Sequence, residues 1–242
     1  MPILNVNLDT VASVRELQRW SEPEPAQAAV LAELAGAGGI SVQFHRGRKT
    51  IRERDLYLLK GIVKSKLIVE LAPTEENIEK VLEIKPWLVF FAADHADPNS
   101  PFSPIDFLTL PSGFNDIIDR FSAVGVNTGF LVEPDEAQIK TASKTGASAL
   151  LIDCTSFTMA RTIAEAQTEL DKIDSAAKFG SKFEMSIFAG RGLTYRNIHP
   201  LVELGLIDEF IIGFAICARA QLVGFDSAVK EMLALINSPV LK

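Results

Sequence analysis

The feature that most limits the possible folds is a regular alternation of short apolar segments with segments of helical spacing. The apolar segments have the length and dense hydrophobicity of strands that are buried on both faces. They cover residues 3–8, 40–44, 67–71, 87–92, 128–132, 149–153, 183–187 and 209–214. The helical segments cover about residues 25–35, 53–63, 114–124, 135–145, 159–179, 195–204 and 215–236, and another begins at Thr74, a suitable N-cap. Such alternation calls for a parallel sheet, and eight units favour a closed (β/α)8 barrel over an open sheet.

The chain shows no sign of division into smaller parts. Its 242 residues match a single α/β barrel of ~250 residues, although two small domains would also fit this length. No linker-like or low-complexity segment separates two halves, and no Gly-x-Gly-x-x-Gly motif follows the first strand to mark a dinucleotide-binding fold. We therefore expect one α/β domain, a (β/α)8 TIM barrel, over residues 1–242.

Composition narrows the class of protein. Hydrophobic residues make up 48% of the chain and charged residues 23%, as in soluble globular proteins, and the net charge of −7 argues against a general nucleic-acid binder. No apolar run reaches the ~18 residues of a membrane span, and the first residues lack the pattern of a signal peptide. Cys154 and Cys217 form neither a disulfide framework nor a metal-ligand spacing. We expect a reduced, cytoplasmic protein without a metal site.

A glycine-rich turn after the seventh strand suggests an anion site. Gly190, Arg191 and Gly192 lead from an apolar strand into a segment of helical spacing. Glycines let backbone N–H groups approach a ligand closely, a helix N-terminus adds partial positive charge, and Arg191 adds a full one. The eighth strand repeats the pattern with Gly213, and the last two loops of a (β/α)8 barrel often build a phosphate site. Alternatively, these glycines are ordinary turn residues.

Residues at the carboxyl ends of the expected strands, nearly all of them polar, are further candidates, because barrel enzymes carry their reactive groups there. These are Asn7, Asp9, Gln43, His45, Arg46, Arg48, Lys49, Glu70, Asp94, His95, Glu133, Asp153, Arg191 and Gly213. Glu70 lies inside an apolar run, where a buried carboxylate needs a partner and suits general acid–base catalysis. Alternatively, Glu70 points to solvent at the strand tip. Asp9 either orients a substrate or caps the following turn.

Residues 45–50 form a basic loop after the second strand. Arg46 and Arg48 in this loop would clamp a second phosphate or help to form a lid, although a basic loop is more often a solvated surface. The remaining candidates have expected structural roles: surface positions for His95 and His199, and packing for Cys154, Cys217 and Tyr195.

Six segments spread over nearly the whole chain follow the pattern of one enzyme family. They are residues 5–9, 39–42, 67–76, 85–86, 189–197 and 213–220. Together they resemble pyridoxine 5′-phosphate synthase. The resemblance implies a (β/α)8 barrel that assembles into a homo-oligomer, commonly an octamer. It also implies the condensation of 1-deoxy-D-xylulose 5-phosphate with 3-amino-2-oxopropyl phosphate, without metal or organic cofactor.

The resemblance also assigns residues. It implies catalysis by Asp9 and Glu70, and phosphate or substrate contacts by Asn7, Arg46, Arg48, Gly190, Arg191, Gly192, Thr194, Gly213 and Phe214. Family histidines fall on Thr10, Gln43, Thr50, Arg191 and Phe214, and a family glutamate falls on Leu151. The family's arginine in the second loop falls on His45, and that in the first loop falls on Gln18. The condensation needs several proton transfers, for which histidines are suited, so these substitutions predict a reduced or altered activity.

Three functions stay open at this point. The first is a working synthase with a rebuilt site. The second is a non-synthase descendant that binds or transforms another phosphorylated metabolite. The third is an interaction protein whose oligomer persists while Leu151, Phe188 and Phe214 fill the pocket. The expected partners are a phosphorylated small molecule and further copies of the chain, with no nucleic acid and no membrane.

Overall fold

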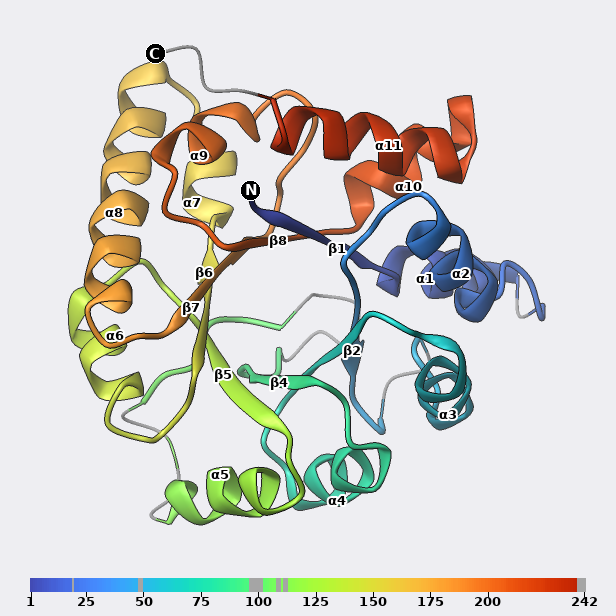
Figure 1. Ribbon diagram of the computed structural model, residues 1–242, viewed down its shortest axis with the longest axis horizontal. Coiled ribbons are helices and arrows are strands. Elements are labelled where there is room, and N and C mark those ends of the chain that lie inside the picture. The colour runs from blue at the N-terminus through green and yellow to red at the C-terminus, as the bar shows by residue number, and fades with distance from the viewer. Residues whose placement is uncertain (19, 48–49, 96–101, 108–109, 111–112, 239–242) are drawn as a thin grey trace.

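The computed structural model is a closed barrel of eight parallel strands in sequence order, which confirms the expected (β/α)8 architecture (Figure 1). It describes residues 1–18, 20–47, 50–95, 102–107, 110 and 113–238. The strands are β1 (Ile3–Asn7), β2 (Gly39–Phe44), β3 (Lys66–Leu71), β4 (Leu88–Phe91), β5 (Asn127–Val132), β6 (Ala149–Asp153), β7 (Ser186–Gly190) and β8 (Glu209–Ile212). The barrel closes where β8 pairs with β1, with Asn5 opposite Ile211.

Helices surround the barrel on its outside (Figure 1). They are α1 (Asp9–Gln18), α2 (Pro25–Leu34), α3 (Glu53–Ile62), α4 (Glu75–Ile84), α5 (Phe114–Ala123), α6 (Glu136–Ala142), α7 (Thr155–Thr158), α8 (Ile163–Ser181), α9 (His199–Leu204), α10 (Phe214–Val223) and α11 (Phe225–Ile236). The expected N-cap of α4 is present, because Thr74 Oγ1 accepts a hydrogen bond from the Asn77 N–H at 3.4 Å. Over the described part of the chain, none of these helices is both long enough and apolar enough to cross a membrane.

Several helix boundaries differ from the expected ones. Helix α1 was not predicted at all. The helix expected over residues 159–179 begins at Ile163 instead, because Thr162 and Glu165 form a capping box there. The helix expected over residues 215–236 is divided by Gly224, because the φ of 85° at this residue lies outside the α-helical range.

Residues alternate along the strands between two apolar layers. Outward residues such as Leu4 and Val6 belong to the large cluster between strands and helices. A second cluster fills the inside of the barrel, where the rings of Phe90 and Phe188 lie edge to face with centroids 5.1 Å apart. Gly129 leaves room for this packing, since a Cβ there would lie 2.6 Å from the Phe90 ring. The middle of the barrel is therefore solid.

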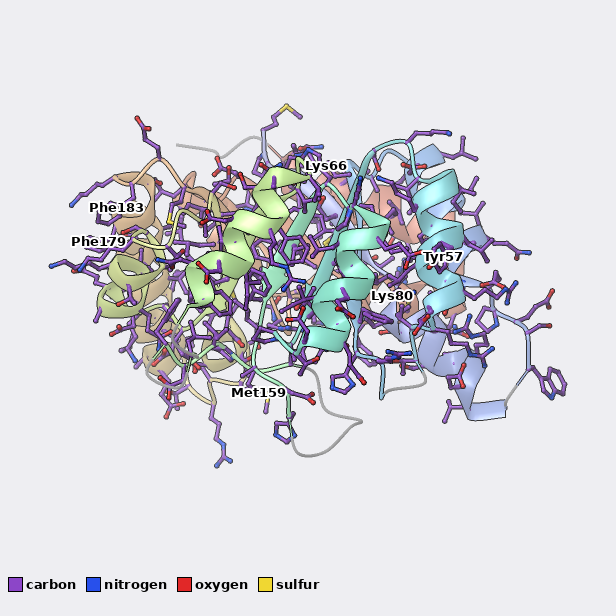
Figure 2. All side chains as sticks on the ribbon, turned by 90° about the horizontal axis from the view of Figure 1, so that it is seen from below. Tyr57, Lys66, Lys80, Met159, Phe179 and Phe183 are labelled. Atoms are coloured by element: carbon purple, nitrogen blue, oxygen red, sulfur yellow. The ribbon has the colours of Figure 1, made fainter. Side chains whose placement is uncertain are left out.

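The amino ends of the strands are closed by a charged group. Glu209 accepts hydrogen bonds from Asn5 Nδ2 at 3.0 Å and from Lys66 Nζ at 2.6 Å. Lys66 also lies over the ring of Trp87, 4.4 Å from its centroid. In Figure 2, Lys66 and Met159 mark opposite ends of the barrel. The end near Lys66 serves stability, and the carboxyl ends of the strands, near Met159, are left for a site.

Candidate functional site

A cavity of about 790 Å³ lies at the carboxyl ends of the strands. It is lined by the residues that the resemblance assigns to the site, with the exception of Arg46 and Arg48: Asn7, Asp9, Thr10, Gln43, Thr50, Glu70, Leu151, Gly190, Arg191, Gly192, Thr194, Gly213 and Phe214. The strand-end rule places these side chains together although they are far apart in the sequence. The cavity is therefore the candidate active site.

Asp9 is held at the mouth of the barrel by the ends of β1 and β2. Its Oδ1 accepts a hydrogen bond from the Gln43 N–H at 2.8 Å, and its Oδ2 accepts one from Asn7 Nδ2 at 2.7 Å. Burial raises the pKa of Asp9 from 3.8 to about 7, while these two hydrogen bonds oppose the rise. A fixed carboxyl group that is half protonated near neutral pH suits general acid–base chemistry.

Arg191 and Glu70 form an ion pair across the barrel mouth. Arg191 follows β7 and Glu70 lies on β3, so the two residues come from opposite sides of the eight-stranded barrel. Arg191 Nη2 donates to Glu70 Oε2 at 2.6 Å, and Gln43 Nε2 donates to the same oxygen at 3.3 Å. The side chain of Glu70 is 2% exposed and that of Arg191 is 15% exposed. Glu70 therefore offsets part of the positive charge that Arg191 was expected to offer to a phosphate.

The glycines at the mouth allow close packing around these groups. Arg191 and Gly192 both have left-handed backbones, with φ of 75° and 64°. A Cβ on Gly192 would lie 2.2 Å from Thr158 Oγ1, and a Cβ on Gly213 would lie 2.7 Å from Asn7 Oδ1. A side chain at position 213 would therefore displace Asn7, which orients Asp9.

Of the two helices expected to point at the cavity, only α10 does so. It begins at Phe214, directly after Gly213, so the unused N–H groups of its first turn and its positive dipole end lie beside the cavity. The expectation that a helix begins at Tyr195 is wrong, because α9 begins at His199. Asn197 closes a turn before it, accepting from the Thr194 N–H at 2.6 Å and donating to the Gly192 carbonyl at 3.0 Å.

The basic segment after β2 contributes less to the cavity than expected. Arg46 Nε pairs with Glu53 Oε1 at 3.3 Å, and Arg46 borders a separate hollow of about 290 Å³. His45 Nε2 pairs with Asp94 Oδ2 at 3.0 Å. Arg48 lies outside the described residues. The structure thus does not bring Arg46 to the main cavity, and the proposed contact of Arg48 stays a prediction.

Large apolar side chains do not fill the cavity. Phe188 is fully buried inside the barrel, and Leu151 is buried beneath the cavity that it lines. Phe214 lies at the rim with 74% of its surface exposed. The filling expected for a vestigial pocket is therefore not observed, since these residues leave the space of about 790 Å³ open.

Helix α1 supplies cavity residues that the sequence pattern does not indicate, namely Ser13, Glu16 and Leu17. The fully buried Arg15 of α1 donates to both Asp55 oxygens at 2.9 and 2.7 Å, and to the Thr50 carbonyl at 2.7 Å. It therefore ties α1 and α3 to the segment that ends at Thr50, beside the cavity. The available signal was Asp9, because an acidic residue just after a strand is typical of the first turn of a helix.

Other reactive residue types have the expected structural positions. Cys154 and Cys217 are buried, and burial raises the pKa of both thiols, to about 11 for Cys217. Burial also raises the pKa of Tyr195 to about 12, and its hydroxyl donates to the Ala228 carbonyl at 2.7 Å. His95 and His199 are exposed. Among the described residues, no group of three or more His, Cys, Asp or Glu side chains is placed to hold a metal ion.

Comparison with known proteins gives consistent matches. Residues 4–238 match the family model described as "Pyridoxal phosphate biosynthesis protein PdxJ". Pyridoxine 5′-phosphate synthase from Pelobacter propionicus is 39% identical, with 98% of this chain and 99% of the relative covered. The same enzyme from Gloeothece citriformis is 36% identical, with 99% and 100% covered. Phosphoribosyl anthranilate isomerase from Thermococcus kodakaraensis shares the fold, with a TM-score of 0.64, 11% identity, and 99% and 100% of the two chains covered.

Proposed function

The chain belongs to the family of the pyridoxal phosphate biosynthesis protein PdxJ, and from this premise we propose that it is a synthase-like protein with reduced or altered condensation activity. In this proposal the cavity binds a phosphorylated substrate of the kind that pyridoxine 5′-phosphate synthases condense. Asp9 and Glu70 then carry the proton transfers that the substituted histidines no longer perform.

The observation that carries the proposal is the environment of the two carboxyl groups. Desolvation of the half-buried Asp9 raises its pKa to about 7, and its carboxyl group is oriented by Asn7 and the Gln43 backbone. Glu70 is held by Arg191 instead, at 2.6 Å. Asp9 is thus able to give or accept a proton near neutral pH, while Glu70 is tied to Arg191.

Reduced activity follows from the residues at the substituted positions. The cavity presents Thr10, Gln43, Thr50, Arg191 and Phe214 where the resemblance places histidines. None of these side chains titrates near neutral pH in its ordinary form. The loss of one positioned acid or base typically lowers a rate by ~10²- to 10⁴-fold, and such losses do not simply add.

Phosphate binding is supported by two sources of positive charge. The first turn of α10 presents backbone N–H groups next to Gly213, and Arg191 contributes a guanidinium. The Glu70 carboxylate limits the second source, because it already accepts from Nη2 of Arg191. We therefore expect the phosphoryl group to bind between the α10 end and Arg191, where it competes with Glu70 for the guanidinium.

A second candidate function is binding without condensation. It is favoured by the Arg191–Glu70 pair, which holds Glu70 in a salt bridge at 2.6 Å rather than leaving it free to contact a substrate. In that case the ligand is a different phosphorylated metabolite. The cavity then serves recognition, and Asp9 sets the pH range of binding.

Self-association is part of the proposal as well. Exposed apolar side chains lie on neighbouring helices, including Leu17 on α1, Leu34 on α2 and Leu222 on α10, each at least 75% exposed. Such a surface suits contact with another copy of the chain. Light scattering after gel filtration measures the assembly directly: a mass well above 26.4 kDa supports self-association, and a monomer at every concentration contradicts it.

Ligand stabilisation tests the proposed function. Purified protein is melted with 1-deoxy-D-xylulose 5-phosphate, with 3-amino-2-oxopropyl phosphate, and with unphosphorylated 1-deoxy-D-xylulose as the matched control. A phosphorylated ligand at 100 times its Kd would stabilise the fold by about 2.7 kcal/mol. Stabilisation by the phosphorylated compounds together with slow product formation is expected. Stabilisation without product would favour the second candidate, and no stabilisation by either compound would contradict both.

A further inference from the structure

We propose that anion binding at Arg191 is coupled to the uptake of a proton by the carboxyl groups of Asp9 and Glu70. The cavity would then take up its ligand as an anion together with a proton. This inference rests on the proposed function, because it concerns the same cavity. It adds a property that arises from the ion pair and is not required for phosphate binding as such.

The proposed coupling depends first on the charged side chains of the cavity wall. Among the described residues that line the cavity, the charged side chains are Asp9, Glu16, Glu70 and Arg191. Glu16 is already paired, with Arg15 at 3.2 Å and with Arg52 at 2.6 Å. Arg191 therefore faces two carboxyl groups, Asp9 and Glu70, that share it as their cationic neighbour.

The second step is competition for the Arg191 guanidinium. Its Nη2 is committed to Glu70 at 2.6 Å, and its Nε is buried with no hydrogen-bond partner among the described residues. An incoming anion competes with Glu70 for this guanidinium, and in the proposed coupling it draws Arg191 away from Glu70. Glu70, with a side chain 2% exposed, would then be a buried carboxylate without its cation, which favours its protonated form.

The third step is the response of Asp9. The negative charge of Glu70 raises the pKa of Asp9, and the positive charge of Arg191 lowers it, although burial is the largest cause of its value of about 7. An anion bound to Arg191 offsets the positive charge that lowers the pKa of Asp9, and its own negative charge raises that pKa further. The two carboxyl groups therefore take up a proton together, whether it resides on Asp9 or on Glu70.

Within the described part of the chain, no other group that faces this pair absorbs the proton. The Asn7 side-chain amide and the Gln43 backbone N–H contact Asp9, and the Gln43 side-chain amide contacts Glu70; all three groups are neutral. Cys217 on α10 also faces Asp9, but its pKa of about 11, raised by burial, keeps the thiol protonated throughout. The Arg191 guanidinium stays charged at all relevant pH values. Proton uptake thus reports on Asp9 and Glu70.

Sulfate is the probe that separates this coupling from titration of the ligand, because it stays a dianion between pH 6 and pH 9. Calorimetric titration of the full chain in buffers of different ionisation enthalpy counts the protons taken up per sulfate bound. We expect the count to approach one at pH 8, where unliganded Asp9 is mostly ionised, and to be smaller at pH 6. The affinity should correspondingly fall by up to about tenfold per pH unit above pH 7.

Substitution of Asp9 and Glu70 tests whether these two groups take up the proton. The double variant Asp9→Asn/Glu70→Gln should bind sulfate with no proton uptake and a flat pH dependence. Glu203→Gln, which removes an exposed carboxylate beside His199, is the matched control and should keep the coupling of the unmodified chain. The proton count of the unmodified protein decides the question even where the double variant does not fold.

The outcomes separate the inference from the function on which it rests. Sulfate binding without proton uptake, at an affinity independent of pH, would overturn the coupling and leave the proposed function standing. Proton uptake that persists in a folded double variant would overturn the assignment to Asp9 and Glu70. No binding of sulfate or of the phosphorylated substrates at any pH would overturn the proposed function and the coupling together.

Discussion

Arg191 extends from the end of β7 across the mouth of the barrel to Glu70 on β3, where its Nη2 lies 2.6 Å from Glu70 Oε2. The two residues are 121 positions apart in the chain, yet each is the other's ion-pair partner. Asp9 lies near enough for both of their charges to affect its pKa. In the proposed coupling, these three residues form one unit that controls charge and protons in the cavity.

Removal of the Arg191 cation should show how strongly Arg191 and Glu70 are coupled. Arg191→Met leaves Glu70 buried without its partner, so we expect a loss of about 3 kcal/mol in the free energy of unfolding at pH 8. The loss should be much smaller when Glu70→Gln is already present, with a coupling energy of about 1–3 kcal/mol. Urea unfolding of both single variants and the double variant measures this cycle. Additive effects would mean that the pair contributes no coupling.

The pH dependence of stability should report on Asp9. Its pKa is about 7 in the folded protein, against an ordinary 3.8, because of burial. The folded state therefore binds more protons than the unfolded state between these values, so the contribution of Asp9 is fully present below about pH 4 and is lost as the pH rises through about 7.

Asp9→Asn removes this dependence. Relative to the unmodified chain, the variant should gain about 2–3 kcal/mol of unfolding free energy between pH 5 and pH 8, as the shift in pKa requires. Denaturant unfolding at several pH values measures the difference, and Asp226→Asn, at an exposed pair with Lys230, is the control that should show no such trend. A difference that is constant with pH would contradict the buried, proton-binding state of Asp9.

The barrel itself could be predicted because its strands are buried on both faces and so appear as continuous apolar runs. Helix α1 was missed because its residues mix polar and apolar types, and its placement depends on the distant contact of Arg15 with Asp55. The break between α10 and α11 was missed for a different reason. A single glycine such as Gly224 is tolerated inside a helical pattern, so it does not by itself indicate a boundary.

Membership of the cavity could also be predicted, but its contacts could not. Strand ends converge in a barrel, which is enough to bring Asp9, Glu70 and Arg191 together. Their pairing depends on the direction of each side chain across the mouth, and no local pattern encodes this direction. Arg46 shows the same limit, since its pairing with Glu53 directs it to a different hollow.

Position 213 should require a glycine, because Asn7 leaves no room there for a side chain. Gly213→Ala places a Cβ 2.7 Å from Asn7 Oδ1 and 2.9 Å from the Asn7 backbone oxygen, so we expect a loss of about 1–3 kcal/mol in stability and weaker ligand binding. Gly61→Ala in α3 is the matched control, because a Cβ there meets nothing within 4 Å. That variant should be more stable by about 0.5–1 kcal/mol. Equal stability of the two variants, by urea unfolding, would contradict the close packing of Gly213 on Asn7.

The buried Arg15 should be far more important for stability than an exposed arginine of the same region. Arg15→Met leaves Asp55 buried without its cation, with an expected loss of about 3–5 kcal/mol. Arg54→Met removes an exposed partner of Glu24 and should lower stability by less than about 1 kcal/mol. Thermal and urea unfolding compare the two. Similar small losses for both would show that the Arg15–Asp55 pair does not hold α1 and α3 together.

The most direct test of the central claim is the rate at which the purified protein forms pyridoxine 5′-phosphate from 1-deoxy-D-xylulose 5-phosphate and 3-amino-2-oxopropyl phosphate. Mass spectrometry follows the product, with a histidine-containing member of the family as the reference. We predict product at a rate at least ~100-fold below the reference, and a further loss of at least ~100-fold in Asp9→Asn. A rate equal to the reference, or one unaffected by Asp9→Asn and Glu70→Gln, would contradict the account.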